Sequence, residues 1–184
     1  LEDGKAQALV VNSGIANVCT GEKGINDSED IAKLVGKELE IKPNNIVVSS
    51  TGLIGAYLPM GKIKTNVKGI KDKLSKKSDA AKAIQTTDTV EKEIAIKKDN
   101  FTIGAIAKGS GMIHPNMATM LCFITTDAKI HHIKLQKMLK NSVDNSFNMI
   151  SVDQDSSTSD MVAIMANGLA GKVDEKEFQT VLDY

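Results

Sequence analysis

The stretch ALVV at positions 8–11 is a short apolar run bounded by polar residues, which is typical of a buried strand. Apolar residues at helical spacing follow it and predict an amphipathic helix over 29–40, with Asp27 and Ser28 as caps. Pro43 separates this helix from IVV at 46–48, which predicts a second strand. A strand, a helix and a second strand in succession indicate a mixed α/β fold.

Hydrophobic periodicity extends this alternation to the rest of the chain. Strands at 94–96 and 101–107 flank a turn and predict a hairpin, and the apolar run 120–125 predicts a central strand. Segment 161–166 fits a helix or a strand, and Gly168 behind it suits a helix C-cap. Further helices are expected at 60–74, where Gly69 weakens the pattern, at 80–85 and around 135–143. The chain is therefore predicted to be a layered α/β protein.

Composition excludes several classes of protein. The 184 residues carry 23 lysines, no arginine and 23 Asp and Glu residues, so the formal net charge is zero. A neutral chain that is poor in aromatic residues is a weak candidate for nucleic-acid binding. No apolar run reaches the roughly 18 residues of a membrane span, and the opening residues lack the pattern of a secretory leader. Two cysteines imply no disulfide framework, and a cytoplasmic location is expected.

Familiar cofactor and metal motifs fail on their spacing. Residues 55–62 resemble a phosphate-binding P-loop but carry one residue too many between the glycines. His131 and His132 are adjacent in sequence and would point to different sides of any regular element. The stretch at 153–157 begins like a calcium loop but lacks its glycine and its last glutamate. No metal or cofactor is therefore expected, and Cys122, inside an apolar run, is expected to be a buried, inert thiol.

Three segments rich in Gly, Asn, Ser and Thr each follow a predicted strand, at 12–17, 49–55 and 108–121. Composition alone favours three ordinary turns. Loops at strand ends are, however, the usual place for a site in α/β proteins. The third segment decides between these readings, because KGSGMI at 108–113 and PNMATML at 115–121 closely resemble the signature of the ornithine acetyltransferase family. Shorter matches occur in family order at NSG (12–14), STG (50–52), QTTDT (85–89), SFN (146–148) and Asp153.

The resemblance implies a self-cleaving precursor with an N-terminal threonine nucleophile. Members of this family are glutamate N-acetyltransferases of arginine biosynthesis, and the bond that they cut corresponds here to Ala118–Thr119. Residues 1–118 would then belong to the family's α chain and residues 119–184 to its β chain, together forming one structural unit. A free N-terminal amine has a pKa of about 7.7–8.0, so Thr119 would carry its own general base.

The resemblance also assigns roles to other residues. The Thr51 hydroxyl and the Gly52 backbone N–H correspond to the family's oxyanion hole, and Lys108 corresponds to a lysine that contacts substrate. A threonine of the QTTDT string also contacts substrate in the family; Thr86 is favoured here, although the sequence does not separate it from Thr87. The implied fold is an α/β sandwich of helices around stacked sheets, shared with N-terminal-nucleophile aminopeptidases.

The implied reaction moves an acetyl group from N2-acetyl-L-ornithine to Thr119, releases ornithine, and then passes the acetyl group to L-glutamate. No cofactor is needed, and the family suggests a heterotetramer of two cleaved α and two β chains. Some members also accept acetyl-CoA, which this sequence does not decide. An N-terminal-nucleophile amidase, which would pass the acyl group to water, is the alternative enzyme.

Departures from the family pattern support a third alternative, a non-catalytic relative that binds an amino acid. Ile15 replaces the usual Asn, and His114 replaces the usual Ala before the cut bond. The family's precursors are also longer, with an opening segment and downstream Glu, Asn and Ser or Thr substrate contacts that lie outside this sequence. The chain is therefore expected to be a central fragment of such a precursor.

Overall fold

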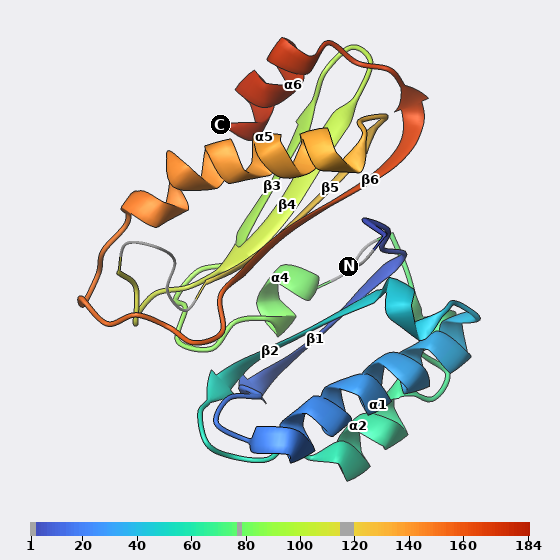
Figure 1. Cartoon of the computed structure of the whole chain (residues 1–184), viewed down its shortest axis with the longest axis vertical. Coiled ribbons are helices and arrows are strands. Elements are labelled where there is room, and N and C mark those ends of the chain that lie inside the picture. The colour runs from blue at the N-terminus through green and yellow to red at the C-terminus, as the bar shows by residue number, and fades with distance from the viewer. Residues whose placement is uncertain (1–2, 77–78, 115–119) are drawn as a thin grey trace. The chain divides into compact units, whose positions relative to one another are not determined.

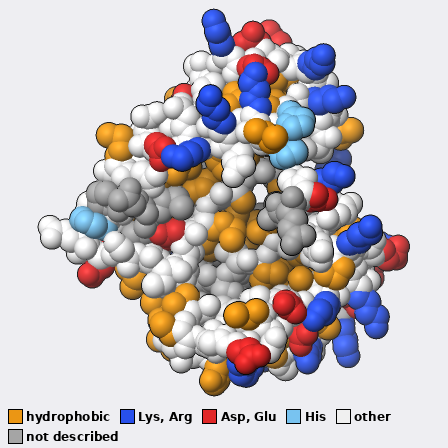
Figure 2. Space-filling view, in the orientation of Figure 1, with side chains coloured by type: hydrophobic (Ala, Val, Ile, Leu, Met, Phe, Trp, Pro, Cys, Tyr) orange, Lys and Arg blue, Asp and Glu red, His pale blue; other side chains and the backbone are white. Residues whose placement is uncertain are grey.

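A computed structural model of the chain describes residues 3–76, 79–114 and 120–184. The chain divides into a first unit, Leu1–Thr86, and a second unit, Thr87–Tyr184. Both units pair helices with a sheet (Figure 1), as the alternating pattern predicts. The expected division after Ala118 concerns a cleaved peptide bond and stays a prediction. On the face shown in Figure 2, lysine side chains are interspersed with Asp and Glu.

The first unit contains two parallel strands, β1 (Ala8–Ile15) and β2 (Ile46–Leu53), joined through α1 (Gly21–Leu39) and η1 (Pro43–Asn45). Figure 1 shows α1 and α2 (Met60–Val67) on one side of this strand pair and α4 (Ala80–Ala83) on the other. Gly69, in the left-handed region, separates α2 from α3 (Ile70–Lys73) and so divides the single helix expected there. The apolar cluster of this unit is formed by Ile31, Val35, Ile46, Leu58 and Val67.

Both strands of the first unit run further than their apolar cores predict. The polar residues 12–15 and 49–53 were expected to be loops but are strand, because the parallel ladder pairs their backbone groups. Helix α1 also begins earlier than expected, so Asp27 and Ser28 lie inside it and cap nothing. Asp27 is 8% exposed, and Lys23, one turn earlier, places its Nζ 2.6 Å from Oδ2 of this carboxylate.

The second unit is a four-stranded sheet in the order β3-β4-β5-β6. The expected hairpin is confirmed as antiparallel β3 (Lys92–Lys97) and β4 (Thr102–Lys108), closed by a hydrogen bond from Lys98 N to Phe101 O of 2.8 Å. Strand β5 (Leu121–Ala128) is antiparallel to β4 and parallel to β6 (Met161–Gly171). Helices α5 (His132–Asp144) and α6 (Glu175–Leu182) cover the sheet (Figure 1), and η2 (Phe147–Met149) follows α5.

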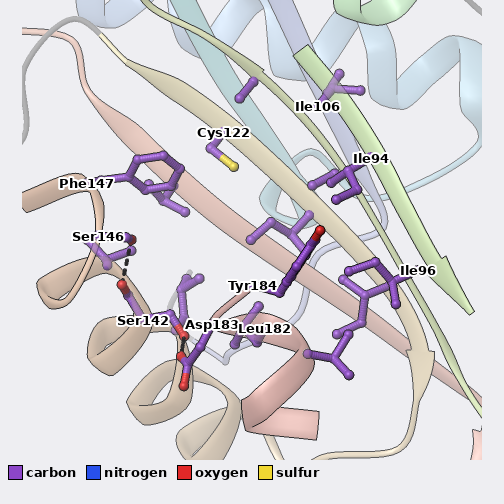
Figure 3. Close-up of a pocket in the computed structure, with 18 of the residues that line it drawn as sticks. Ile94, Ile96, Ile106, Cys122, Ser142, Ser146, Phe147, Leu182, Asp183 and Tyr184 are labelled. Atoms are coloured by element: carbon purple, nitrogen blue, oxygen red, sulfur yellow. Dashed lines mark hydrogen bonds between the residues drawn. The ribbon is translucent and has the colours of Figure 1, made fainter. Parts of the chain in front are cut away.

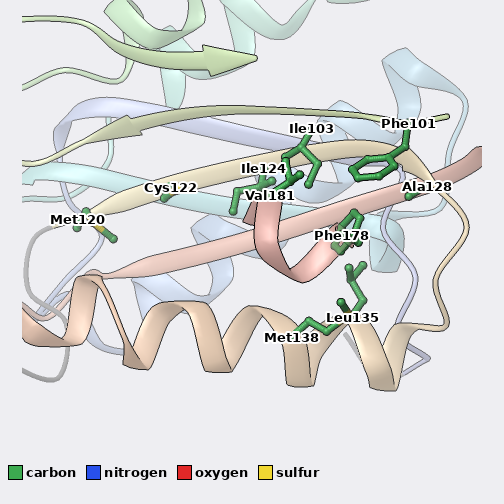
Figure 4. Packing of buried hydrophobic residues seen from close by; sticks show 10 residues of the cluster. All are labelled: Phe101, Ile103, Met120, Cys122, Ile124, Ala128, Leu135, Met138, Phe178 and Val181. Carbon is green, nitrogen blue, oxygen red and sulfur yellow. The ribbon is translucent and has the colours of Figure 1, made fainter. Parts of the chain in front are cut away.

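An apolar cluster lies between this sheet and its two helices (Figure 4). The rings of Phe101 and Phe178 lie 5.5 Å apart between centroids, and Phe178 is fully buried. Burying a phenylalanine contributes about 2–3 kcal/mol, so this side chain is one of the contacts that hold α6 on the sheet. The other buried members are Ile103, Met120, Cys122, Ile124, Ala128, Leu135, Met138 and Val181.

Segment 161–166, which the sequence left open, belongs to strand β6. The expectation of a helix C-cap at Gly168 is therefore wrong: Gly168 lies within a strand, at φ +75°, where the β5–β6 register shifts. Parallel pairing with β5, a contact distant in sequence, decides the outcome. None of the helices in the described ranges is long and apolar enough to cross a membrane.

Candidate functional site

The predicted oxyanion residues lie together at the carboxyl ends of β1 and β2 in the first unit. In the parallel register Ser13 pairs with Thr51, and Gly14 pairs with Gly52. Thr51 is only 3% exposed although it lies near the end of its strand. An oxyanion donor must be in place before charge develops, and a buried residue near the end of a strand suits this requirement.

Close backbone packing requires glycine at position 52. Its φ is +128°, in the range that favours glycine. A Cβ at this position would lie 2.3 Å from the Gly14 carbonyl carbon and 2.7 Å from the Ile15 nitrogen. Both neighbours are backbone atoms of the paired strand, so neither can move without breaking the ladder. Gly52 is thus fixed by its contact with Gly14.

Polar side chains around these strand ends hold the backbone in place. The Ser50 hydroxyl donates to Asn12 Oδ1 (2.6 Å), and Asn12 Nδ2 donates to the Ile15 carbonyl (2.8 Å). The Ser13 hydroxyl donates to the Ala83 carbonyl of α4 (2.7 Å). The residues of the NSG and STG matches therefore bond mainly to the backbone and to each other. This network explains why polar residues occupy positions at the ends of two strands.

Lys108 is the last residue of β4, and its side chain is among the largest that are fully buried, at 1% exposure. Burial lowers the pKa of its ammonium, while the carboxylates of Asp88 and Asp160 act in the opposite direction and Lys92 adds to the lowering. A lysine is rarely buried to this extent unless acidic groups compensate it. The predicted substrate-contacting lysine therefore lies in a charged cluster inside the second unit.

Asp88 ties the QTTDT string to the segment that follows Lys108. Its side chain is completely buried, and its Oδ1 lies 2.6 Å from Lys92 Nζ and 2.7 Å from the Gly109 nitrogen, which donates to it. Thr87 precedes Asp88 and Ser110 follows Gly109, and the hydroxyl oxygens of Thr87 and Ser110 lie 2.8 Å apart. The Thr87 hydroxyl is thus occupied within the protein, and the choice between Thr86 and Thr87 stays open.

Two further aspartates hold the signature segment on either side of 115–119. Asp153 accepts hydrogen bonds from the backbone N–H groups of Met112 (2.5 Å) and Ile113 (2.9 Å), which lower its pKa. Asp160 accepts from the Met120 N–H (2.7 Å), and burial raises its pKa. The sequence drew attention to Asp153 through its family match but not to Asp160. The position of Asp160 directly before an apolar run was the available signal.

The described part of the second unit also contains an apolar cavity of about 370 Å³ between the sheet and α5–α6. Figure 3 shows Ile94, Ile96 and Cys122 on the sheet side and Phe147, Leu182 and Tyr184 on the helix side. On its helix side the polar groups bond to each other: the Ser142 hydroxyl donates to Asp183, and Ser146 donates to the Ser142 carbonyl. Neither Lys108 nor Asp88 lines it, and its apolar wall does not suit a zwitterionic amino acid.

The predicted site residues therefore fall into separate groups. Thr51, Gly52 and Thr86 belong to the first unit, and Lys108 belongs to the second. Thr119 and Ala118, the predicted nucleophile and cleavage site, lie outside the described residues. The structure brings together Thr51 with Gly52, and Lys108 with Asp88 and Asp160. The buried, inert character expected of Cys122 is supported by its 3% exposure and by burial that raises its pKa to about 11.

Comparison with known proteins identifies the family. The profile of the ArgJ family matches residues 1–184. The chain is 51% identical over 176 residues to the arginine biosynthesis bifunctional protein ArgJ of Symbiobacterium thermophilum, covering 92% of this chain and 44% of that protein. It is 55% identical over 169 residues to ArgJ of Staphylococcus aureus, covering 89% of this chain and 41% of that protein. The chain thus spans less than half the length of these relatives.

A solved structure supports the same assignment. It is ornithine acetyltransferase from Mycobacterium tuberculosis in complex with ornithine, which is 39% identical to this chain with a TM-score of 0.57. The match covers 60% of this chain and 62% of that one. The α/β fold expected from the resemblance to ornithine acetyltransferases is therefore confirmed. On the evidence of the sequence profile, the relatives and this structure, the chain belongs to the ArgJ family.

Proposed function

We propose that this chain forms part of an acetyltransferase of arginine biosynthesis, which moves acetyl from N2-acetyl-L-ornithine to L-glutamate. The observation that carries the proposal is the Thr51–Gly52 pair, with a buried hydroxyl and a glycine fixed against the Gly14 backbone. A rigid pair of neighbouring donors, one hydroxyl and one backbone N–H, suits the oxyanion of a tetrahedral acyl-transfer intermediate. Family membership makes this the reaction that the pair would serve.

The proposed nucleophile is Thr119, freed by self-cleavage of the Ala118–Thr119 bond. The Thr119 hydroxyl attacks the acetyl carbonyl of acetylornithine and passes its proton to the Thr119 amine. The tetrahedral intermediate then collapses as the bond between the acetyl carbon and the ornithine nitrogen breaks and the Thr119 ammonium returns the proton to that nitrogen. Ornithine departs, and Thr119 carries the acetyl group as an ester. The glutamate amine then attacks the ester and regenerates the free hydroxyl. One amide replaces a similar one, so the exchange requires no external energy source.

Lys108 is the proposed partner of a substrate carboxylate, and Thr86 the proposed second substrate contact. The Asp88 and Asp160 carboxylates partly neutralise the positive charge of this buried ammonium. How strongly Lys108 attracts a substrate carboxylate therefore depends on how strongly it interacts with these two groups. We also propose that the whole protein assembles from two cleaved α and two β chains in the cytoplasm, divided between Ala118 and Thr119.

The test measures products from N2-acetyl-L-ornithine and L-glutamate with protein expressed from its natural gene. Acetylglutamate is expected, whereas free acetate alone would contradict the transferase and support an amidase. Thr51→Ala removes one oxyanion donor and is expected to lower kcat by about 100- to 1,000-fold. Thr65→Ala is the matched control, because it also removes a threonine hydroxyl from the first unit, but an exposed one in α2 that donates to the Gly61 carbonyl of its own helix, so kcat should stay close to that of wild type. Bound acetylornithine without any product would instead favour a non-catalytic relative.

A further inference from the structure

Asp160 connects the start of β5 to the start of β6. Its Oδ1 accepts the Met120 N–H at 2.7 Å, and the next residue, Met161, donates its own N–H to the Met120 carbonyl at 3.0 Å. Met120 is therefore bonded on both sides of its backbone by two consecutive residues. Its side chain is also buried, at one end of the apolar cluster (Figure 4). These contacts leave Met120 little freedom to move.

The strand register places Lys108 beside the same point. Lys108 of β4 pairs with Leu121 of β5, and Leu121 pairs with Met161 of β6, so these three residues form one row across the sheet. Met120 and Asp160 each stand one residue before this row. The Lys108 ammonium and the Asp160 carboxylate attract each other there, with Asp88 as a second acidic neighbour of Lys108. The carboxylate thus acts on both a backbone amide and the buried lysine.

We propose that Asp160 is a positioning residue for acyl transfer: its carboxylate fixes the backbone of Met120, the residue that directly follows the proposed nucleophile in the sequence, in register with Lys108. This inference rests on the proposed function, in which Thr119 is the nucleophile. Met120 is the covalent neighbour of Thr119 and the first described residue after it, because Thr119 itself lies outside the described residues.

Self-cleavage makes such a restraint necessary. Once the Ala118–Thr119 bond is cut, Thr119 is a chain terminus, and terminal residues move freely unless they are tied down. A displacement of about 1 Å at a reacting group costs on the order of 100-fold in rate. The Met120 N–H is the first backbone donor after the nucleophile, and the Asp160 carboxylate is placed to hold it. The burial that raises the pKa of Asp160 is consistent with a carboxylate used for structure inside the protein.

The test compares Asp160→Ala, Asp160→Asn and Asp127→Ala in protein expressed from its natural gene. Asp127 is the matched control, because its Oδ1 accepts the Thr102 N–H at the same 2.7 Å, at the other end of β5. We expect Asp160→Ala to lower both kcat and the rate constant of Ala118–Thr119 cleavage by about 100-fold. Asp160→Asn keeps an acceptor oxygen and should recover most of this loss, whereas Asp127→Ala should keep wild-type kcat within about threefold.

Amide hydrogen exchange of Met120, measured on the same samples, separates this inference from the proposed function. Wild-type protein that neither cleaves nor makes acetylglutamate would contradict the proposed function. In that event, faster Met120 exchange in Asp160→Ala than in Asp127→Ala would still support the restraint, and equal exchange would overturn it. In active protein, kcat and cleavage rates in Asp160→Ala that match those of Asp127→Ala would overturn the inference. Thermal unfolding of all three variants identifies any loss that comes only from misfolding.

Discussion

The strand ends of the first unit and the Lys108 cluster of the second unit hold their predicted site residues in place by different physical means. At Thr51 and Gly52 the restraint is steric, because the Gly14 backbone fills the space that a Cβ would need. At Lys108 the restraint is electrostatic, because a fully buried ammonium lies among carboxylates from other segments. The first arrangement should therefore respond to added volume and the second to changes in charge and pH.

The largest effect is expected from Gly52→Ala. The added methyl would lie 2.3 Å from a backbone carbon at a residue with φ +128°, so strand β2 must shift or its pairing with β1 must break. A loss of more than about 4 kcal/mol in the free energy of unfolding of the first unit is expected. Urea denaturation followed by circular dichroism measures it.

Gly61→Ala is the matched control, since nothing lies within 4 Å of a Cβ there and the residue is in α2. Here the free energy of unfolding should rise by up to about 1 kcal/mol, because alanine favours a helix. Equal effects of the two substitutions would show that the contact with Gly14 does not restrict position 52.

Lys108→Met should have the next largest effect. Methionine keeps most of the apolar length of the side chain but removes the ammonium, leaving the buried Asp88 carboxylate and the half-buried Asp160 carboxylate with less positive charge nearby. Removing one partner of a buried ionic group costs about 3 kcal/mol in the free energy of unfolding. The transition of the second unit should move, while that of the first unit stays in place. A variant as stable as wild type would show that the two carboxylates do not depend on Lys108.

The pH dependence of the free energy of unfolding, compared between wild type and Lys108→Met, sharpens the contrast between the two regions. Burial lowers the pKa of Lys108 below 10.5, so between its folded-state pKa and 10.5 the unfolded chain binds more protons than the folded one. Stability contributed by this group therefore rises with pH across that window. The free energy of unfolding of wild type relative to Lys108→Met should therefore increase as the pH is raised toward 10.5. Gly52→Ala relative to wild type should show no such trend, and a falling Lys108 difference would contradict the assignment.

The smallest effect is expected at the two cysteines. It concerns how readily a reagent reaches each thiol, and not the stability of the protein. Burial raises the pKa of Cys122 to about 11, whereas Cys19 is exposed. At about pH 8 a disulfide reagent should react with one thiol in native protein and with two in denaturant, because the thiolate is the reactive form. Cys122→Ala should leave the native count unchanged. Two reactive thiols in native protein would mean that the cluster around Cys122 opens readily.

Most elements of the fold could be predicted from the sequence, but their ends could not. The polar residues of NSG and STG look like loop residues because the parallel pairing that accommodates them joins positions 38 apart, as between Asn12 and Ser50. In the sequence Asp27 resembles a helix cap. In the structure it lies inside α1, and its charge is neutralised by Lys23, one turn earlier. Helix α6 was not expected, and the Phe101–Phe178 contact that holds it is distant in sequence.

The family resemblance supplied the residues of the candidate site, whose roles stay predictions, but not the contacts that support them. Thr51, Gly52 and Lys108 were expected from a family resemblance, yet the reason that position 52 must be glycine depends on the β1–β2 register. Asp160 was missed because its role depends on parallel pairing between β5 and β6, which sequence periodicity does not reveal. Residues that carry chemistry leave a local signature, whereas residues that position them depend on contacts between distant segments.

The most direct test of the central claim, that Thr119 becomes an N-terminal nucleophile, is the intact mass of the protein under denaturing conditions. Protein expressed from its natural gene should give two species, one of which begins at Thr119. After brief exposure to acetylornithine, that species should gain the mass of one acetyl group, and Thr119→Ala should give a single uncleaved chain. A single species from the wild type, with no acetylated form, would contradict the account.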